Sequence, residues 1–442
     1  MKFDHPIIDT DGHLLEVIPH VAEYAREIGG AAVTDRLVAK HSQGYTPIGG
    51  NALAWWATPR DALDRATSFV PKLLHERLPE LGIDFAIVYP TSGLAVLREP
   101  DAELRHVATR AFNSYYADHM RDLSDRITIP AAIPMDTPEE AIGHLEHAVN
   151  ELGFKAALFA SYVPRPTKDG VHYDVFGVDS AYDYDPVWQR CIDLGVAYTA
   201  HSGSQAIGFR STTSYMYNHV GHFAESGHAI AKALLLGGVT RRFPKLNFAF
   251  LEGGAAYAVI MLADVIARFE KRGGANIHNL DPARLDTETF YALLEQYGGA
   301  RYATDEVRRS TSALQDTHPE NLDEFWRMEA KSAEDIIDLF VSHFYFGCEA
   351  DDPTNAWAFN PNNPHGVRLR AVLGSDIGHW DVPDFREVLP EAYELVEHGL
   401  LTDDDFREFA CDNAIRLHGG MNPRFFDGTA VEAYAREFLR SN

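Results

Sequence analysis

Near its N-terminus the chain reads Ile7-Ile8-Asp9-Thr10-Asp11-Gly12-His13, a short apolar run that ends in two carboxylates, a glycine and a histidine. This pattern predicts a buried parallel strand with polar groups at its C-terminal end. Because side chains two residues apart on a strand lie on the same face, Asp11 and His13 point the same way. An oxygen and a nitrogen ligand placed in this manner form half of a divalent-metal site. The remaining ligands are expected at the ends of later strands.

Seven further apolar runs follow, and most of the intervals between them have a helical pattern. The runs cover residues 84–89, 127–135, 154–160, 196–200, 246–251, 343–346 and 370–373. Eight runs of this kind predict an α/β protein with a (β/α)8 TIM barrel, in which helices surround parallel strands. A doubly wound open sheet is the alternative. It is disfavoured because no Gly-x-Gly-x-x-Gly sequence follows the first run.

The chain is longer than its barrel. A TIM barrel needs roughly 250 residues, whereas the chain has 442. We therefore expect a single domain, residues 1–442, with insertions at about 16–81 and 273–331, after the first and sixth strands. The second insertion is polar and rich in charge, as expected of an arm outside the core. From Pro383 onward the pattern is helical and predicts a helical C-terminal tail.

The composition limits the possible partners. A formal net charge of −26 argues against nucleic acid, because phosphate binding needs clustered Lys and Arg. The most apolar helical run, 255–269, is too short and too charged to cross a membrane, and the N-terminus has no signal-peptide core. Three widely spaced cysteines form neither a disulfide framework nor a zinc knuckle. We therefore expect a cytoplasmic protein that binds neither nucleic acid nor membranes.

Barrel enzymes carry their chemistry at the C-terminal ends of the strands. Besides Asp11 and His13, the expected ends carry His201, Glu252, Glu349 and Asp376. A mixed set of nitrogen and oxygen ligands suits Zn²⁺, Mn²⁺ or Fe²⁺. Glu349 is also consistent with a helix cap in a solvated loop, and we favour that interpretation for it.

The chain also resembles the amidohydrolase superfamily, in particular the amidohydrolase-related branch similar to aminocarboxymuconate-semialdehyde decarboxylase. The resemblance rests on motifs in the same order along almost the whole chain: Asp9-x-Asp11-x-His13, His201, Phe243-Pro-Lys-Leu before a run that ends in Gly253-Gly254, Gly374-Ser375-Asp376, and Asp412-Asn413-Ala414-x-x-Leu417-x-Gly419. It implies a TIM barrel that holds one divalent metal ion. The ligands that it implies are Asp11, His13, His201 and Asp376.

Two positions depart from the pattern of that branch. Asp11 stands where the branch usually has histidine, and this harder oxygen ligand favours Mn²⁺ over Zn²⁺, with Fe²⁺ less favoured. Glu252 stands where the branch commonly has a catalytic histidine. Either Glu252 acts as a general acid or base, or it is an extra ligand, or His219 takes the catalytic role. The resemblance also implies that Asp376 accepts a proton from the metal-bound water.

Three residues are candidates for substrate binding. Arg60 lies in the insertion where relatives carry an arginine that pairs with a substrate carboxylate, although a surface arginine at a helix start fits equally well. Tyr89, at the end of the second run, and Trp380, just past Asp376, are expected to line the pocket.

Three functions are compatible with this set of residues. The first is a metal-dependent hydrolase of a small organic molecule. There the ion lowers the pKa of its water from about 15.7 toward roughly 7, and the hydroxide attacks an amide, ester or lactone-like bond. The second is a non-oxidative decarboxylase of a small aromatic or muconate-like carboxylate. The third is a catalytically silent binding barrel, against which the complete ligand set argues. Glu252 favours hydrolysis, and the 273–331 arm suggests a homodimer.

Overall fold

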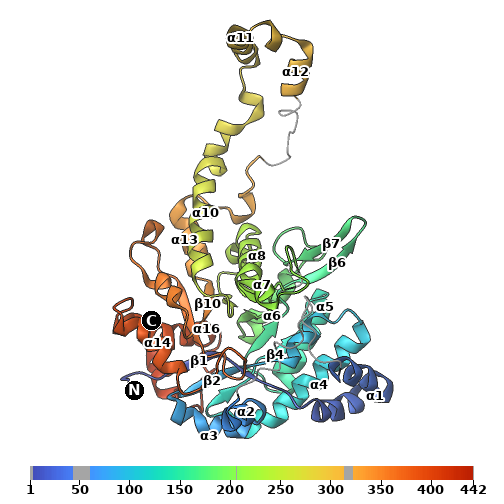
Figure 1. The fold of residues 1–442 in the computed structure, drawn as a ribbon, viewed down its shortest axis with the longest axis vertical. Helices are drawn as coiled ribbons and strands as arrows, with labels where there is room; N and C mark the ends of the chain where they lie inside the picture. The colour runs from blue at the N-terminus through green and yellow to red at the C-terminus, as the bar shows by residue number, and fades with distance from the viewer. Residues whose placement is uncertain (1–2, 43–59, 206, 313–321, 442) are drawn as a thin grey trace.

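The computed structural model describes residues 3–42, 60–205, 207–312 and 322–441, and their parallel strands form a barrel (Figure 1). Hydrogen-bonded neighbours follow the orders β1-β2-β3 and β4-β5-β8-β9-β10-β11, and every pairing in the two groups is parallel. The bounds are β1 Ile8–Leu14, β2 Phe85–Pro90, β3 Ile127–Thr128, β4 Ala131–Ile133, β5 Ala157–Phe159, β8 Tyr198–Ala200, β9 Phe248–Phe250, β10 Phe344–Glu349 and β11 Arg370–Gly374.

Two junctions close the barrel. β3 and β4 continue one strand across Pro130, which has no N–H to give to a ladder. β11 meets β1 through backbone hydrogen bonds from Asp376 N to Asp11 O (2.8 Å) and from His13 N to Ile377 O (2.7 Å). Each of the eight predicted apolar runs therefore supplies one barrel strand, and the predicted TIM barrel is confirmed.

The strands are buried on both faces, which explains why their sequences are continuous apolar runs rather than alternating ones. All seven residues of β1 are buried, as are all six of β2. The helices that cover the barrel or link its strands are α4 Ala102–Met120, α5 Pro138–Glu146, α6 Asp185–Leu194, α7 Tyr215–His219, α8 His222–Leu236, α9 Val239–Arg242, α10 Ala256–Arg272 and α13 Ala333–Val341. As an example of local control, the Thr137 side chain accepts from Glu140 N and starts α5, with Pro138 in its first turn.

Both predicted insertions and the helical tail are present. The first insertion holds α1 Ile18–Ser42, α2 Ala62–Phe69 and α3 Pro71–Leu81, while its residues 43–59 lie outside the described part. The second continues from α10 into an arm that projects away from the barrel and carries α11 Thr287–Gly298 and α12 Asp305–Ser312 (Figure 1). The tail consists of α14 Val388–Glu397, α15 Asp403–Arg407, α16 Asn413–Gly419 and α17 Glu432–Ser441.

An antiparallel hairpin after β5 was not predicted from the sequence. It consists of β6 Val163–Thr167 and β7 Gly170–Asp174, between the predicted apolar runs 154–160 and 196–200. Pro164 and Pro166 hide the strand signal, because proline is normally excluded from strands that pair on both sides. Among the described residues, no helix is both long and apolar enough to cross a membrane.

The carboxylate of Asp9 ties the first strand to the end of the last one. It accepts hydrogen bonds from Ser375 N (2.9 Å), Ser375 Oγ (2.6 Å) and Asp11 N (3.1 Å), and Asp9 is only 1% exposed. The two contacts with Ser375 span 366 residues of chain. They hold together the two strand ends that carry the first and last predicted metal ligands.

Replacing Asp9 with alanine is expected to destabilise the protein by about 3 kcal/mol, because three buried donors lose a charged acceptor. Urea unfolding followed by circular dichroism measures the change. Asp122→Ala, at an exposed aspartate, is the matched control and should shift stability by at most ~0.5 kcal/mol. Equal unfolding midpoints for Asp9→Ala and wild type would mean that barrel closure does not depend on this carboxylate.

Candidate metal centre

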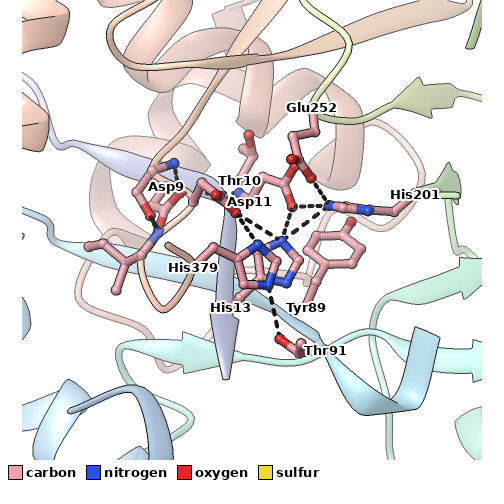
Figure 2. A network of polar contacts seen from close by, with 12 residues as sticks. Asp9, Thr10, Asp11, His13, Tyr89, Thr91, His201, Glu252 and His379 are labelled. Atoms are coloured by element: carbon pink, nitrogen blue, oxygen red, sulfur yellow. Dashed lines mark hydrogen bonds and ion pairs between the residues drawn. The ribbon is translucent and has the colours of Figure 1, made fainter. Parts of the chain in front are cut away.

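The four predicted ligands meet where three strands end, and Figure 2 shows three of them, Asp11, His13 and His201. Asp11 and His13 lie on β1, His201 follows β8 and Asp376 follows β11. His13 Nε2 lies 3.2 Å from His201 Nε2, 3.6 Å from Asp11 Oδ1 and 3.4 Å from Asp376 Oδ1. His201 Nε2 is also 3.2 Å from Asp11 Oδ1. All four side chains are at most 5% exposed.

The spacing of these atoms fits a shared cation. Ligands bound at 2.0–2.2 Å to a tetrahedral ion lie about 3.3–3.6 Å from each other. Hydrogen bonding alone does not satisfy the group, because His201 Nε2 carries at most one hydrogen but contacts Asp11, His13 and Glu252, the last at 3.2 Å. Among the described residues, Asp11 Oδ1 and Glu252 Oε2 are buried and accept no hydrogen bond.

The imidazoles of His13 and of the neighbouring His379 are held in their neutral form. Burial lowers the pKa of His13 well below its usual value, and the neighbouring His379 and His201 lower it further. Burial likewise lowers the pKa of His379 well below its usual value. A neutral imidazole is the form that binds a metal ion.

The carboxyl groups of the site carry more negative charge than nearby cationic side chains balance. Burial raises the pKa of Asp376 well above its usual value, and the charges of Glu252 and Asp381 raise it further. Burial also raises the pKa of Glu252, with contributions from Glu349 and Asp11. A cation among these groups favours the ionised carboxylates and relieves their repulsion. The donor set therefore fits a divalent ion.

Two of these carboxylates sit on unusual backbone. Glu252 has φ 58° and Asp376 has φ 46°, both in the left-handed region that residues other than glycine rarely adopt. Conformations of this kind cost roughly 1–3 kcal/mol each and are found preferentially at functional sites. Here they lie two residues after the ends of β9 and β11, where the chain leaves the barrel strands.

A small cavity of about 60 Å³ opens beside the cluster. Four residues of the sequence-based set line it: His201, His219, Glu252 and Trp380. Tyr89 lies beneath the cluster rather than in the cavity: it is 1% exposed, its OH donates to Thr199 Oγ1 (3.0 Å), and its ring centroid is 5.7 Å from that of His201. Arg60 is exposed just before α2 and does not line the cavity. A substrate-binding role for Arg60 stays a prediction.

The interpretation of Glu349 as a solvated helix cap is wrong. The side chain of Asp352 caps the 3-10 helix that follows. Glu349 is half-buried, and burial together with the charges of Asp381 and Asp351 raises the pKa of its carboxyl to about 8. Its run of acidic neighbours resembles a surface loop in sequence, but the chain half-buries Glu349 close to Asp381 and Asp11.

Sequence analysis missed two residues of the site. His379 Nδ1 lies 2.7 Å from Asp376 Oδ1, its Nε2 lies 3.1 Å from Thr91 Oγ1, and its ring stacks on His13 with centroids 3.8 Å apart (Figure 2). The Asp376-x-x-His379 spacing was the available signal. Arg98 lines the cavity from the 3-10 helix Ser92–Arg98 after β2. No motif marks it, because its position depends on a loop.

Comparisons with known proteins agree with this architecture. An amidohydrolase family model matches residues 79–275. In fold the chain is similar to an amidohydrolase from Mycobacterium avium subsp. paratuberculosis (14% identity, 95% of this chain and 100% of that chain covered, TM-score 0.57). It is also similar to a dihydroxybenzoic acid decarboxylase from Polaromonas with bound manganese and the inhibitor 2-nitroresorcinol (16%, 94% and 97%, 0.55). A third similar structure is a 2,6-dihydroxybenzoate decarboxylase with 2,6-dihydroxybenzoate (16%, 94% and 99%, 0.53). The predicted resemblance to the amidohydrolase superfamily is confirmed.

Removing a ligand should weaken metal binding without unfolding the barrel. We expect His201→Ala and Asp376→Asn to bind Mn²⁺ at least about 100-fold more weakly than wild type. Each variant removes a direct bond to the ion, and this costs no less affinity than losing a residue that only hydrogen-bonds to a metal ligand. Equilibrium dialysis with elemental analysis measures this. His398→Ala, at an exposed histidine after α14, is the control and should bind as wild type does. Unchanged affinity in both ligand variants would contradict the site.

Proposed function

Taking the chain as a metal-dependent enzyme of the amidohydrolase superfamily, we propose that it is a non-oxidative decarboxylase of a small aromatic carboxylate. The observation that carries the proposal is Arg98, whose side chain lines the same cavity as His201 and Glu252. A guanidinium binds a carboxylate through paired, charge-assisted hydrogen bonds. In a cavity otherwise rich in acidic groups, it supplies the attraction that an anionic substrate needs.

Neighbouring groups orient Arg98. Its Nη1 donates to the hydroxyl of Tyr162 (3.2 Å), and that hydroxyl donates to Gly203 O (2.9 Å). His222 lines the cavity nearby, and burial lowers its pKa to about 2, with the charges of His219, His201, Arg210 and Arg98 adding. His222 is therefore neutral and does not compete with the guanidinium for the carboxylate.

Apolar rings define the rest of the cavity. Phe223 and Trp380 both line it, and their faces suit the stacking of a flat aromatic ring. Two structures of similar fold are dihydroxybenzoate decarboxylases, one of them with manganese and a resorcinol inhibitor. They support an ortho-hydroxylated benzoate as the substrate class.

The chemistry divides between the ion and the chain. When bound by Asp11, His13, His201 and Asp376, a divalent ion supplies Lewis acidity that binds and polarises substrate oxygen atoms. The chain must deliver a proton to the carbon that bears the carboxylate. We assign this to Asp376 and His379, whose Oδ1 and Nδ1 atoms are 2.7 Å apart. The proton adds to that carbon, the bond to the carboxylate breaks with its electron pair left on the carbon, and CO₂ departs. Solvent then returns one proton to the pair.

Hydrolysis of an amide, ester or lactone-like bond is the second candidate. It is favoured by Glu252, whose Oε2 lies 3.2 Å from His201 Nε2 at the cavity and is suited to accept a proton from an attacking water. A cytoplasmic location and a homodimer formed through the 273–331 arm stay predictions alongside it.

Arg98→Ala is expected to raise KM for 2,6-dihydroxybenzoate about 100-fold, because the carboxylate loses a charged partner worth roughly 2–3 kcal/mol. CO₂ release from the substrate measures turnover. Arg36→Ala, at a surface arginine paired with Asp101 and Glu103, is the control. If none of a panel of hydroxybenzoates releases CO₂ while an ester or lactone is hydrolysed, the decarboxylase proposal falls and hydrolysis replaces it.

His379→Gln should lower kcat about 100-fold and leave KM and metal content near wild type, because general acid–base groups contribute roughly that factor to the rate. Steady-state kinetics combined with elemental analysis of the same preparation test this. Lost metal in His379→Gln would instead identify His379 as a ligand.

A further inference from the structure

Glu16, two residues after the end of β1, holds the chain segment that follows β2. Its carboxylate accepts hydrogen bonds from three backbone amides and one hydroxyl group: Thr91 N (3.1 Å), Ser92 N (2.7 Å), Gly93 N (3.2 Å) and Tyr116 Oη. We infer that Glu16 is a positioning residue, which fixes the segment 91–98 so that Arg98 meets the substrate. The inference rests on the proposed function, in which Arg98 binds the substrate carboxylate.

The segment 91–98 forms one wall of the cavity beside the metal centre. The residues that it contributes to the lining are Thr91, Leu94, Ala95 and Arg98. At one end of the segment, Thr91 Oγ1 lies 3.1 Å from Nε2 of His379 (Figure 2). At the other end, Arg98 is the last residue of the 3-10 helix Ser92–Arg98. A contact that fixes the first turn of this helix therefore bears on both the proton-donating pair and the carboxylate-binding group.

The first turn of this 3-10 helix takes its hydrogen-bond acceptor from another strand. Amides at a helix N-terminus have no acceptor within the helix, and the Thr91 side chain, at the N-cap position, makes no capping hydrogen bond. Glu16 fills this role, and its negative charge is also favourable near a helix N-terminus. One side chain thus links the end of β1, the strand that carries Asp11 and His13, to the helix that carries Arg98.

The contact requires a carboxylate rather than any polar side chain. All four partners donate, so both oxygens of residue 16 must accept, and only an ionised carboxylate has acceptors at both positions. Glu16 is 6% exposed and its donors are neutral groups, so burial of its charge has a desolvation cost that the four hydrogen bonds offset. Glutamine at this position would turn an NH₂ group toward one of the donors. Glu16→Gln therefore disrupts the contact at nearly constant side-chain volume.

Close packing leaves the segment little room to settle elsewhere. A Cβ atom at Gly93 would lie 2.5 Å from the hydroxyl oxygen of Tyr116 and 2.8 Å from Cβ of Pro90. Glycine at this position lets the backbone approach both α4 and the Glu16 carboxylate. Tyr116 itself is only 1% exposed, so the fourth donor is fixed in the core.

Hydrogen exchange followed by mass spectrometry tests the contact without a substrate. In Glu16→Gln we expect the segment 91–98 to exchange about 10-fold faster than in wild type, because losing one charge-assisted hydrogen bond changes the opening equilibrium by roughly that factor. The helix α17 should exchange as in wild type. Glu23→Gln, at an exposed glutamate on α1, is the matched control. Mn²⁺ affinity near that of wild type would show that the Glu16→Gln barrel and metal centre are intact.

A double-mutant cycle distinguishes positioning of Arg98 from general destabilisation. Isothermal titration calorimetry measures the Kd of 2,6-dihydroxybenzoate for the Mn²⁺-loaded protein. Glu16→Gln should raise this Kd about 10-fold when Arg98 is present. In an Arg98→Ala background the same change should raise it at most about 2-fold, because a residue that acts through Arg98 has no further effect once Arg98 is gone, whereas independent effects would multiply.

Unchanged exchange of the segment 91–98 in Glu16→Gln would overturn the inference, as would an equal rise in Kd in both backgrounds. If Glu16→Gln does not fold, Tyr116→Phe takes its place: it removes one donor and keeps the carboxylate, and exchange as slow as in wild type would then refute the inference. If wild type does not bind 2,6-dihydroxybenzoate, the decarboxylase proposal falls, while the exchange of 91–98 still decides whether Glu16 holds this segment.

Discussion

The junction between the first and last barrel strands is the contact on which the rest of the site depends. The backbone bonds between Asp11 and Asp376, and the carboxylate of Asp9 on Ser375, bring together chain segments separated by nearly the full length of the protein. Because ligand atoms on both sides of this seam must lie within a few ångströms of one another, small shifts in register would dismantle the metal centre. The same contacts therefore close the barrel and place the ligands.

Much of the fold and part of the site could be predicted from the sequence. Each barrel strand is a continuous apolar run because it is buried on both faces, and the strand-end rule then locates Asp11, His13, His201 and Asp376. Arg98 lies on a connecting segment after β2 that no motif marks, so its place in the site could not be predicted, whereas the Asp376-x-x-His379 spacing was an available signal for His379. The β6–β7 hairpin was not predicted either, because its prolines suppress the usual strand signal.

The chemistry of the centre also bears on stability. Neutral imidazoles and crowded carboxylates are packed together where too few cationic side chains of the described residues compensate them. Binding of cations therefore stabilises the folded state over the unfolded one by mass action, since the unfolded chain has no preformed site. The strained backbone of Glu252 and Asp376 belongs to the same site.

The projecting arm contributes little to the folding stability of the protein. None of the residues of α11 or α12 is buried, so substitutions there remove no core contacts and cost little folding free energy. The barrel rim, by contrast, tolerates few changes, because its polar groups depend on one another. The chain thus combines a barrel whose rim groups depend on one another with an arm whose surface can change at little cost in folding free energy.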